Sequence, residues 1–343
     1  MSTPVPLGRR RGTAVAALAL ATLFWGSSFF TVKRCGEILH DGAPGTSAAS
    51  GPLLLTAVRF TIAIPILLIF WREARVWRPR RRDLAPLMKV ALAMSAGFLT
   101  QAAGLAWTTA TLSAFLTSLV VCLTPAAEWA LHGRRVGWRL GASVALATGG
   151  VALMTLTRGG GYSFGVGEAL SLLCAAAFAL QILWTNEAAE RVGPAGLTVG
   201  SFTIVAAIAW ITVLGLWGRA VPVALRAAAG QREFLWMFAV VLLFSTIGAM
   251  FLMNTFQRYI RPTEAAVIYT TEPVFAGLFA FAYLGPSEWL GAWGLAGAGV
   301  VFAADLLAGL KFGEEPVPPF PADHVASPSG RPTERDQGKK PGA

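Results

Sequence analysis

Ten segments of about 20 mostly apolar residues follow one another along this chain, and mainly short polar stretches separate them. An apolar helix of that length is long enough to cross a membrane, and lipid tolerates no unpaired backbone in such a segment. The sequence therefore predicts an all-α integral membrane protein with ten transmembrane helices. The segments are residues 12–32, 53–71, 86–106, 111–131, 138–156, 165–185, 196–217, 235–256, 264–284 and 287–309.

The chain also repeats itself. Residues 59–64 read RFTIAI and residues 201–206 read SFTIVA, and a proline inside an apolar segment follows each copy, at Pro125 and Pro273. A Leu-Gly-Ala opens the last segment of each half, at 140–142 and 290–292. An odd number of crossings in each copy turns the second copy upside down in the membrane, as in many secondary transporters. We therefore expect two inverted five-helix repeats, 12–156 and 165–310, joined by a Gly-rich linker, 157–164.

Composition supports a membrane protein. Hydrophobic residues make up 55% of the chain and charged residues only 13%, against about 25% charged in a soluble domain. The net charge of +10 could suggest nucleic acid, but most charges lie between apolar segments. The expected partner is therefore the lipid bilayer and not nucleic acid. The three widely spaced cysteines indicate neither a disulfide framework nor a metal site.

The distribution of arginine and lysine predicts the orientation. With the N-terminus inside, seventeen of these residues fall on inner segments and six on outer ones, as the positive-inside rule requires. One loop, 218–234, has three Arg and disagrees locally. We expect both termini to be cytoplasmic: a short tail at 1–11, and a proline-rich, disordered tail at 311–343. The Ala-, Gly- and Arg-rich composition suggests a bacterial inner membrane.

Several stretches resemble the EamA branch of the drug/metabolite transporter superfamily. They are FWGSSFFTVK (24–33), the Arg59-Phe60 pair, GLAWTTATLSAFLTSLVVCLTP (104–125) and QRYIRPTEAAVIYTTEPVFAGLFAFAYLG (257–285). The resemblance covers residues 12–309 and implies a ten-helix carrier of small-molecule substrates, often an exporter of amino acids or drug-like solutes. The chain departs from a Leu-Gly-Glu common in the family: after the ninth segment it reads Leu284-Gly285-Pro286, and Glu288 comes two residues late.

Glu272 is the principal candidate for function, because ionisable groups within a membrane are costly. It stands directly before Pro273, whose ring removes a backbone donor and clashes with the carbonyl of Tyr269. A helix broken at this point exposes polar backbone that must line a cavity or pack inside protein. Glu272 could bind a proton, a cation or an amine there; the alternative is a buried Glu paired with a neighbouring helix.

Other polar residues within the apolar segments are candidates for the same cavity. Alternatively, such side chains join helices by hydrogen bonds of about 1 kcal/mol or less. The predicted helix breaks are Pro125 and Pro273. The predicted substrate-binding residues are Trp25, Ser28, Gln101, Gln181, Asn254, Tyr269 and Glu272.

The remaining charged residues have simpler interpretations. Arg59 could bind an anionic substrate group, but pairing with Glu168 or reaching toward the interface is favoured. Lys33 and Arg34 are interpreted as an interfacial anchor. Small residues in 138–156 and 287–309 predict close helix packing, within the chain or between two copies in a homodimer.

No motif for ATP use, for a zinc protease or for a serine hydrolase is present. We therefore expect no catalytic residues, metal or cofactor. The favoured hypothesis is a secondary carrier that alternates access around a cavity between the repeats. The alternatives are an integral-membrane enzyme acting on a lipid, which would need a cluster of acids, histidines or metal ligands at one membrane face, and a non-transporting membrane scaffold.

Overall fold

A computed structural model describes residues 7–133, 138–156, 164–260 and 262–309. All regular structure in these residues is helical. Most of the predicted linker, 157–163, and the predicted C-terminal tail, 311–343, lie outside the described residues.

The first half contains five long helical segments and one short connecting helix. The first of them continues well past the predicted end at Val32. The helices are α1 (Leu7–Asp41), α2 (Ser50–Phe70), α3 (Arg72–Val76), α4 (Arg81–Leu105), α5 (Ala110–Ser118), α6 (Val120–His132) and α7 (Trp138–Leu156).

The second half follows the same order, with a π-helical stretch (η1) in its third long segment. A helix, α10, occupies part of the loop 218–234. The helices are α8 (Val166–Val192), α9 (Pro194–Trp217), α10 (Val221–Ala229), α11 (Arg232–Val240), η1 (Val241–Gly248), α12 (Ala249–Phe256), η2 (Gln257–Tyr259), α13 (Pro262–Tyr269), α14 (Glu272–Leu284), η3 (Pro286–Glu288) and α15 (Gly291–Gly309).

Among the described residues, eight helical segments are long and apolar enough to cross a membrane. Two further apolar helices, Gly141–Met154 in α7 and Gly291–Ala304 in α15, are shorter. The chain is therefore a multi-pass membrane protein, and the count of ten crossings remains a prediction.

Two of the long segments are interrupted. In the second half, α13 ends at Tyr269 and α14 begins at Glu272, so the chain breaks directly before Pro273. In the first half the predicted break at Pro125 is wrong: Pro125 lies inside α6, and the interruption is at Leu119. A proline ring disturbs the helical turn that precedes it. Around Leu119 the backbone hydrogen bonds span three residues: the Leu119 N–H donates to the carbonyl of Leu116, and the Cys122 N–H donates to that of Leu119.

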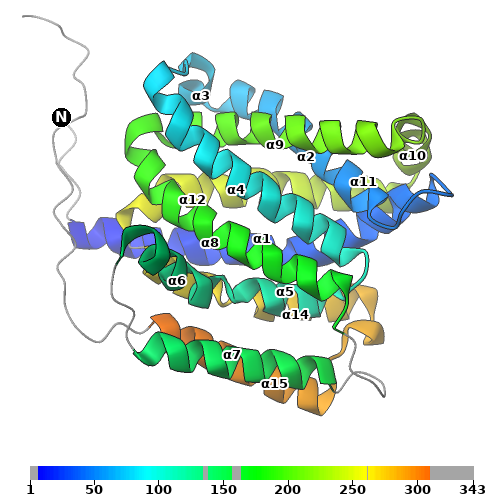
Figure 1. Cartoon of the computed structure of the whole chain (residues 1–343). Helices are drawn as coiled ribbons and strands as arrows, with labels where there is room; N and C mark the ends of the chain where they lie inside the picture. The colour runs from blue at the N-terminus through cyan, green and yellow to red at the C-terminus, as the bar shows by residue number, and fades with distance from the viewer. Residues whose placement is uncertain (1–6, 134–137, 157–163, 261, 310–343) are drawn as a thin grey trace, which may run out of the picture. The chain divides into compact units, whose positions relative to one another are not determined.

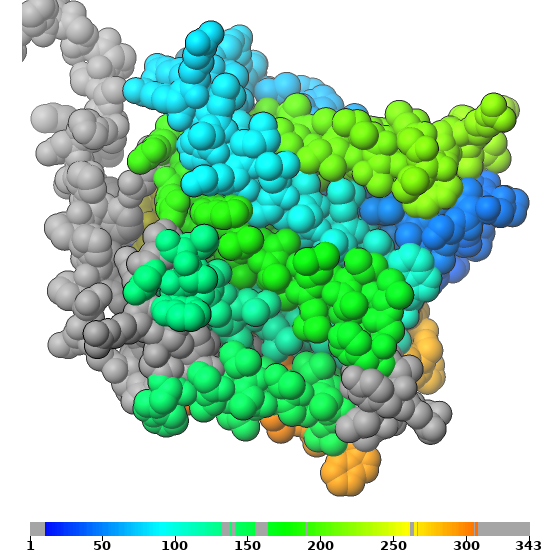
Figure 2. Space-filling model, viewed as in Figure 1, coloured from blue at the N-terminus to red at the C-terminus, as the bar shows by residue number. Residues whose placement is uncertain are grey.

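The two halves pack against each other through several helix pairs. The pairs α4–α8, α2–α9, α1–α14 and α7–α15 each join one helix from either half, and α4 and α8 run across the face seen in Figures 1 and 2. The α7–α15 pair is closely packed, since a methyl group added to Gly150 would have only 2.8 Å to the carbonyl oxygen of Gly297. Close packing of these helices within the chain, one of the two predicted alternatives, is therefore confirmed.

Candidate functional site

A cavity of about 50 Å³ lies between the two halves, where both interrupted helices come together. Ser118 and Val120 flank the first interruption, and Tyr269 and Glu272 flank the second. We call it the central cavity. Its lining residues are Trp25, Ser28, Phe98, Gln101, Thr117, Ser118, Val120, Phe178, Gln181, Ile182, Met250, Met253, Tyr269 and Glu272.

Twelve of the fourteen lining residues form pairs that stand 152 or 153 residues apart. Trp25 and Ser28 of α1 match Phe178 and Gln181 of α8 at a spacing of 153. At a spacing of 152, further pairs contribute one residue from each half: Phe98 and Met250, Gln101 and Met253, Thr117 and Tyr269, Val120 and Glu272. The central cavity is thus built twice from the repeat, and Glu272 has an apolar counterpart.

Six of the seven residues predicted to bind substrate line this cavity, and Asn254 does not. Its side chain is buried and donates a hydrogen bond to Thr198 Oγ1 of α9 at 2.8 Å. The residue that matches Gln101 is Met253, one position earlier. Because successive residues of a helix point about 100° apart, that single step turns Asn254 away from the cavity.

The Glu272 carboxylate faces the central cavity without a partner. Its side chain is half-buried, and it forms no hydrogen bond or ion pair with any described residue. The break before it is held to α1 by a contact of 3.0 Å between the hydroxyl oxygens of Thr22 and Thr271. Glu272 is thus an acid positioned at a helix interruption and open to whatever enters the cavity.

A chain of hydrogen bonds connects the cavity to the turn between α12 and α13. Tyr269 packs edge-on against Trp25, with ring centroids 5.2 Å apart, and its hydroxyl donates to Gln257 Oε1 at 3.0 Å. The amide of Gln257 donates to Asn186 Oδ1 at 2.6 Å, and Asn186 donates to the carbonyl of Ile260 at 3.2 Å. We call Asn186, Gln257, Ile260 and Tyr269 the Asn186 cluster.

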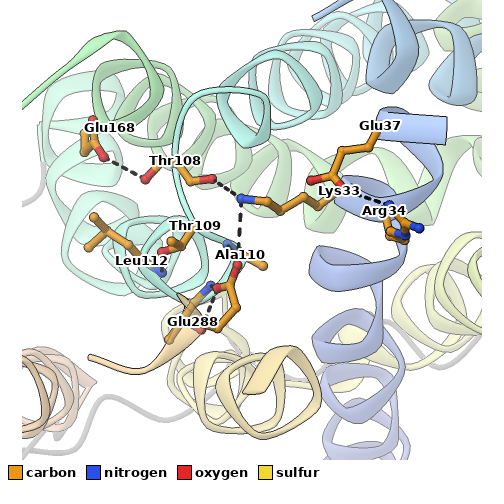
Figure 3. Close-up of polar contacts among 10 residues, drawn as sticks. Lys33, Arg34, Glu37, Thr108, Thr109, Ala110, Leu112, Glu168 and Glu288 are labelled. Atoms are coloured by element: carbon orange, nitrogen blue, oxygen red, sulfur yellow. Dashed lines mark hydrogen bonds and ion pairs between the residues drawn. The ribbon is translucent and has the colours of Figure 1, made fainter. Parts of the chain in front are cut away.

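A second polar cluster surrounds the turn between α4 and α5 (Figure 3). Lys33 donates to the carbonyl of Thr108 at 2.7 Å and lies 3.7 Å from Glu288 Oε1. The buried Glu288 accepts from the backbone N–H of Ala110 at 3.3 Å, and from the N–H and hydroxyl of Thr111 at 3.0 Å each. It therefore caps the N-terminus of α5, where backbone donors have no partner within the helix.

Glu168 completes this arrangement. It accepts a hydrogen bond from the Thr108 hydroxyl at 2.6 Å and another from the Gly165 N–H at 2.9 Å at the start of its own helix. We call Lys33, Thr108, Thr111, Glu168 and Glu288 the Lys33 cluster. It joins the α4–α5 turn of the first half to α8 and η3 of the second.

The interpretation of Lys33 and Arg34 as an interfacial anchor stays a prediction, and both side chains also bond residues outside α1. Lys33 belongs to the Lys33 cluster, and Arg34 makes two bonds to Glu233 of α11, at 2.8 and 3.0 Å. Arg34 also lies 3.4 Å from Glu37 on its own helix. Both side chains therefore join α1 to other parts of the fold.

A family model matches the chain twice, over residues 12–156 and 165–310, and describes the EamA-like transporter family. The chain belongs to the EamA-like transporter family. The resemblance found in the sequence is thereby confirmed, and the chain is a membrane transporter of that family.

Two further similarities agree with this assignment. An uncharacterized transporter of Archaeoglobus fulgidus is 29% identical over 291 residues, which span 83% of this chain and 84% of the relative. A protein of known crystal structure superposes with a TM-score of 0.62 and 16% identity, covering 87% of this chain and 96% of its own. At that identity the structural likeness shows the fold alone.

Arg59 of this EamA-like transporter does not pair with Glu168, as the sequence had favoured. Arg59 as a residue is 2% exposed, and its guanidinium forms no hydrogen bond or ion pair with a described residue. Its central carbon lies 5.1 Å from the ring centroid of Phe60 and 4.9 Å from that of Phe98. Glu168 is engaged by Thr108 and Gly165 instead.

Sequence reasoning missed the apolar part of the cavity wall. Phe98, Phe178, Met250 and Met253 carry no polar signal within apolar helices, so nothing in the sequence set them apart. Among the described residues, no group of three or more His, Cys, Asp or Glu is placed to hold a metal ion.

Proposed function

We propose that this chain is a secondary carrier that moves small metabolites, such as amino acids or drug-like solutes, by alternating access around the central cavity. The two halves would sit inverted in a bacterial inner membrane, with ten crossings and both termini in the cytoplasm. The observation that carries the proposal is the position of the cavity. It lies at two helix interruptions, one from each half, as sites in inverted-repeat carriers do.

The size of the cavity supports alternation. A volume of about 50 Å³ has room for a few water molecules, whereas sites for small-molecule ligands usually span roughly 300 Å³ or more. A solute therefore enters only if the lining helices separate. The two halves meet at this cavity, so a rocking motion of one half against the other would widen it.

The Lys33 and Asn186 clusters are suited to act as alternate closures. Lys33 bonds the carbonyl of Thr108 between α4 and α5, and Asn186 bonds that of Ile260 between α12 and α13. These donors are 153 residues apart and these carbonyls 152. In an inverted repeat, equivalent turns lie on opposite sides of the membrane. In the proposed orientation the Lys33 cluster closes the outer side, toward which an exporter releases solute.

Transport by purified protein in liposomes tests this function, with a panel of amino acids and other small metabolites in the presence and absence of a pH gradient. We expect movement of at least one solute, driven by the gradient, and loss of that dependence in Glu272→Gln. Glu37→Gln, a change at an exposed carboxylate on α1, is the matched control and should transport normally. The absence of movement for the whole panel would contradict the proposal, and normal coupled transport by Glu272→Gln would remove the role of Glu272.

A reporter enzyme that is active only in the periplasm tests the orientation separately. Fused after Lys311, it should be inactive if the C-terminus is cytoplasmic. An active fusion would reverse the assignment of the two clusters to inner and outer sides without affecting the site.

A further inference from the structure

Arg59 is the only described cation within a spanning segment that is fully buried without an acidic or carbonyl partner. It lies on α2, nine residues into the candidate span Ser50–Phe70. An arginine carries five N–H donors and stays charged in proteins. None of these donors is hydrogen-bonded to a described residue, and Nε is sealed from solvent as well.

The aromatic contacts of Arg59 do not offset this burial. Each cation–π contact, to Phe60 and to Phe98, contributes about 0.5–2 kcal/mol. The effective penalty for burying an ion amounts to several kcal/mol even after relaxation. Phe60 and Phe98 also leave every N–H without an acceptor. The free-energy cost of burying the Arg59 charge is therefore offset only when acceptor oxygens form hydrogen bonds with the guanidinium.

Phe98 connects Arg59 to the central cavity. The Phe98 ring lines the cavity and packs against Phe178 of α8, with centroids 5.2 Å apart. The same ring lies against the Arg59 guanidinium, so one aromatic side chain separates the charge from the cavity. Trp25, also in the wall, has a second buried N–H without a partner. The Trp25 N–H in the cavity wall and the Arg59 N–H groups behind it have no acceptors among the described residues. A ligand with several acceptor oxygens would supply them.

We infer that Arg59 is the residue that recognises a carboxylate group on the transported solute, and that Phe98 covers it until the solute enters. This rests on the proposed transport function. An arginine fork binds a carboxylate through two parallel hydrogen bonds. A single carboxylate suits the site better than a phosphate, because Arg59 supplies one positive charge.

Paired probes in a thermal-stability assay test this inference on the purified full chain. The pairs are leucine and leucinamide, phenylalanine and phenylalaninamide, and benzoate and benzamide, so that each amide keeps the rest of the molecule and replaces the carboxylate by a neutral carboxamide. We expect at least one carboxylate to raise the unfolding temperature while its amide does not. The loss of one charge-assisted bond, worth about 1.5–3 kcal/mol, corresponds to roughly 10- to 150-fold weaker binding.

Variants separate recognition from a purely structural role. Arg59→Met should raise the unfolding temperature without ligand, because it removes an uncompensated charge, and should abolish the shift caused by the carboxylate. Arg59→Lys keeps the charge but lacks the planar guanidinium. It should need at least a roughly tenfold higher carboxylate concentration to give the same shift in unfolding temperature. Arg226→Met, at an exposed arginine on α10, is the control and should leave the shift unchanged.

Each contrary result overturns the inference. Wild-type protein that responds to no carboxylate, or equally to carboxylate and amide, has no such site. A lower unfolding temperature in unliganded Arg59→Met would make Arg59 a structural anchor. The liposome assay distinguishes these failures from failure of the transport function: movement of amines or neutral solutes without a carboxylate preference would leave the function standing and reject the role of Arg59.

Discussion

Replacing Glu288 by alanine removes the acceptor that caps α5 and leaves a lysine without its counter-charge. The wild-type carboxylate accepts three hydrogen bonds from Ala110 and Thr111, at 3.0 to 3.3 Å, and lies 3.7 Å from Lys33 Nζ. Removing one partner of a buried pair of this kind costs about 3–5 kcal/mol. At roughly 2 °C per kcal/mol for a large domain, Glu288→Ala should lower the unfolding temperature by about 6–10 °C.

Glu37→Ala is the matched control. Glu37 also faces an arginine, Arg34, at 3.4 Å, but its side chain is 45% exposed, against 2% for Glu288. Exposed pairs of this kind contribute about 0–1 kcal/mol, so the unfolding temperature should fall by no more than about 2 °C. The readout is thermal unfolding of purified protein in one detergent.

A double variant sharpens the test. Lys33→Met in the Glu288→Ala background removes the uncompensated charge and should restore part of the lost stability, as expected for residues in one network. The reasoning is refuted if Glu288→Ala and Glu37→Ala lower the unfolding temperature equally. It is also refuted if the effects of Lys33→Met and Glu288→Ala simply add.

Two further variants test the packing and the cavity wall. Gly150→Ala should destabilise the protein by about 1–3 kcal/mol through overpacking against Gly297. The control Gly149→Ala, whose added methyl group meets open space, should be neutral or stabilising in the same unfolding assay. Equal effects of the two variants would contradict the α7–α15 contact. Gln101→Ala should change the solute concentration that gives half-maximal transport in liposomes, because Gln101 lines the cavity. Asn254→Ala, at a residue that does not line it, should leave that concentration within about twofold of the wild-type value. The opposite result would contradict the register of α12.

The apolar pattern and the repeat predicted the helical segments well, because both depend on spacing along the chain. Part of the polar lining was also predictable, since Gln101, Gln181 and Glu272 are costly to place in lipid. Thr117 and Ser118, which also line the cavity, were not predicted. Asn254 is as polar as these residues but faces α9. Polarity therefore predicts that a residue is buried inside the bundle, and only the helical register decides which space it faces.

The helix interruptions illustrate a different limit. The proline rule predicts a disturbed turn ahead of Pro125 and of Pro273, and the second interruption lies within three residues of its proline. The first lies six residues ahead, at Leu119. Where a helix yields depends on the local packing around the weakened turn, which the sequence does not reveal.

The Lys33 cluster could not be predicted because its partners are remote in sequence. Lys33 and Glu288 are 255 residues apart, and each stands near a segment end, where charged residues usually reach for the interface. Glu288 also falls two residues after the position that the family resemblance suggests. Its role follows only from the fold, which brings η3 against the start of α5.

The two proposed closures, the Lys33 cluster and the Asn186 cluster, differ in chemistry although they lie at equivalent turns of the repeat. At the α4–α5 turn the donor is a lysine with an acidic neighbour; at the α12–α13 turn it is the amide of Asn186. Bonds from charged groups contribute about 1.5–3 kcal/mol and neutral ones about 1 kcal/mol. A difference of 1.4 kcal/mol shifts a two-state equilibrium tenfold. We therefore expect the unloaded carrier to favour the state in which the Lys33 cluster is closed, so that solute is captured from the side of the Asn186 cluster.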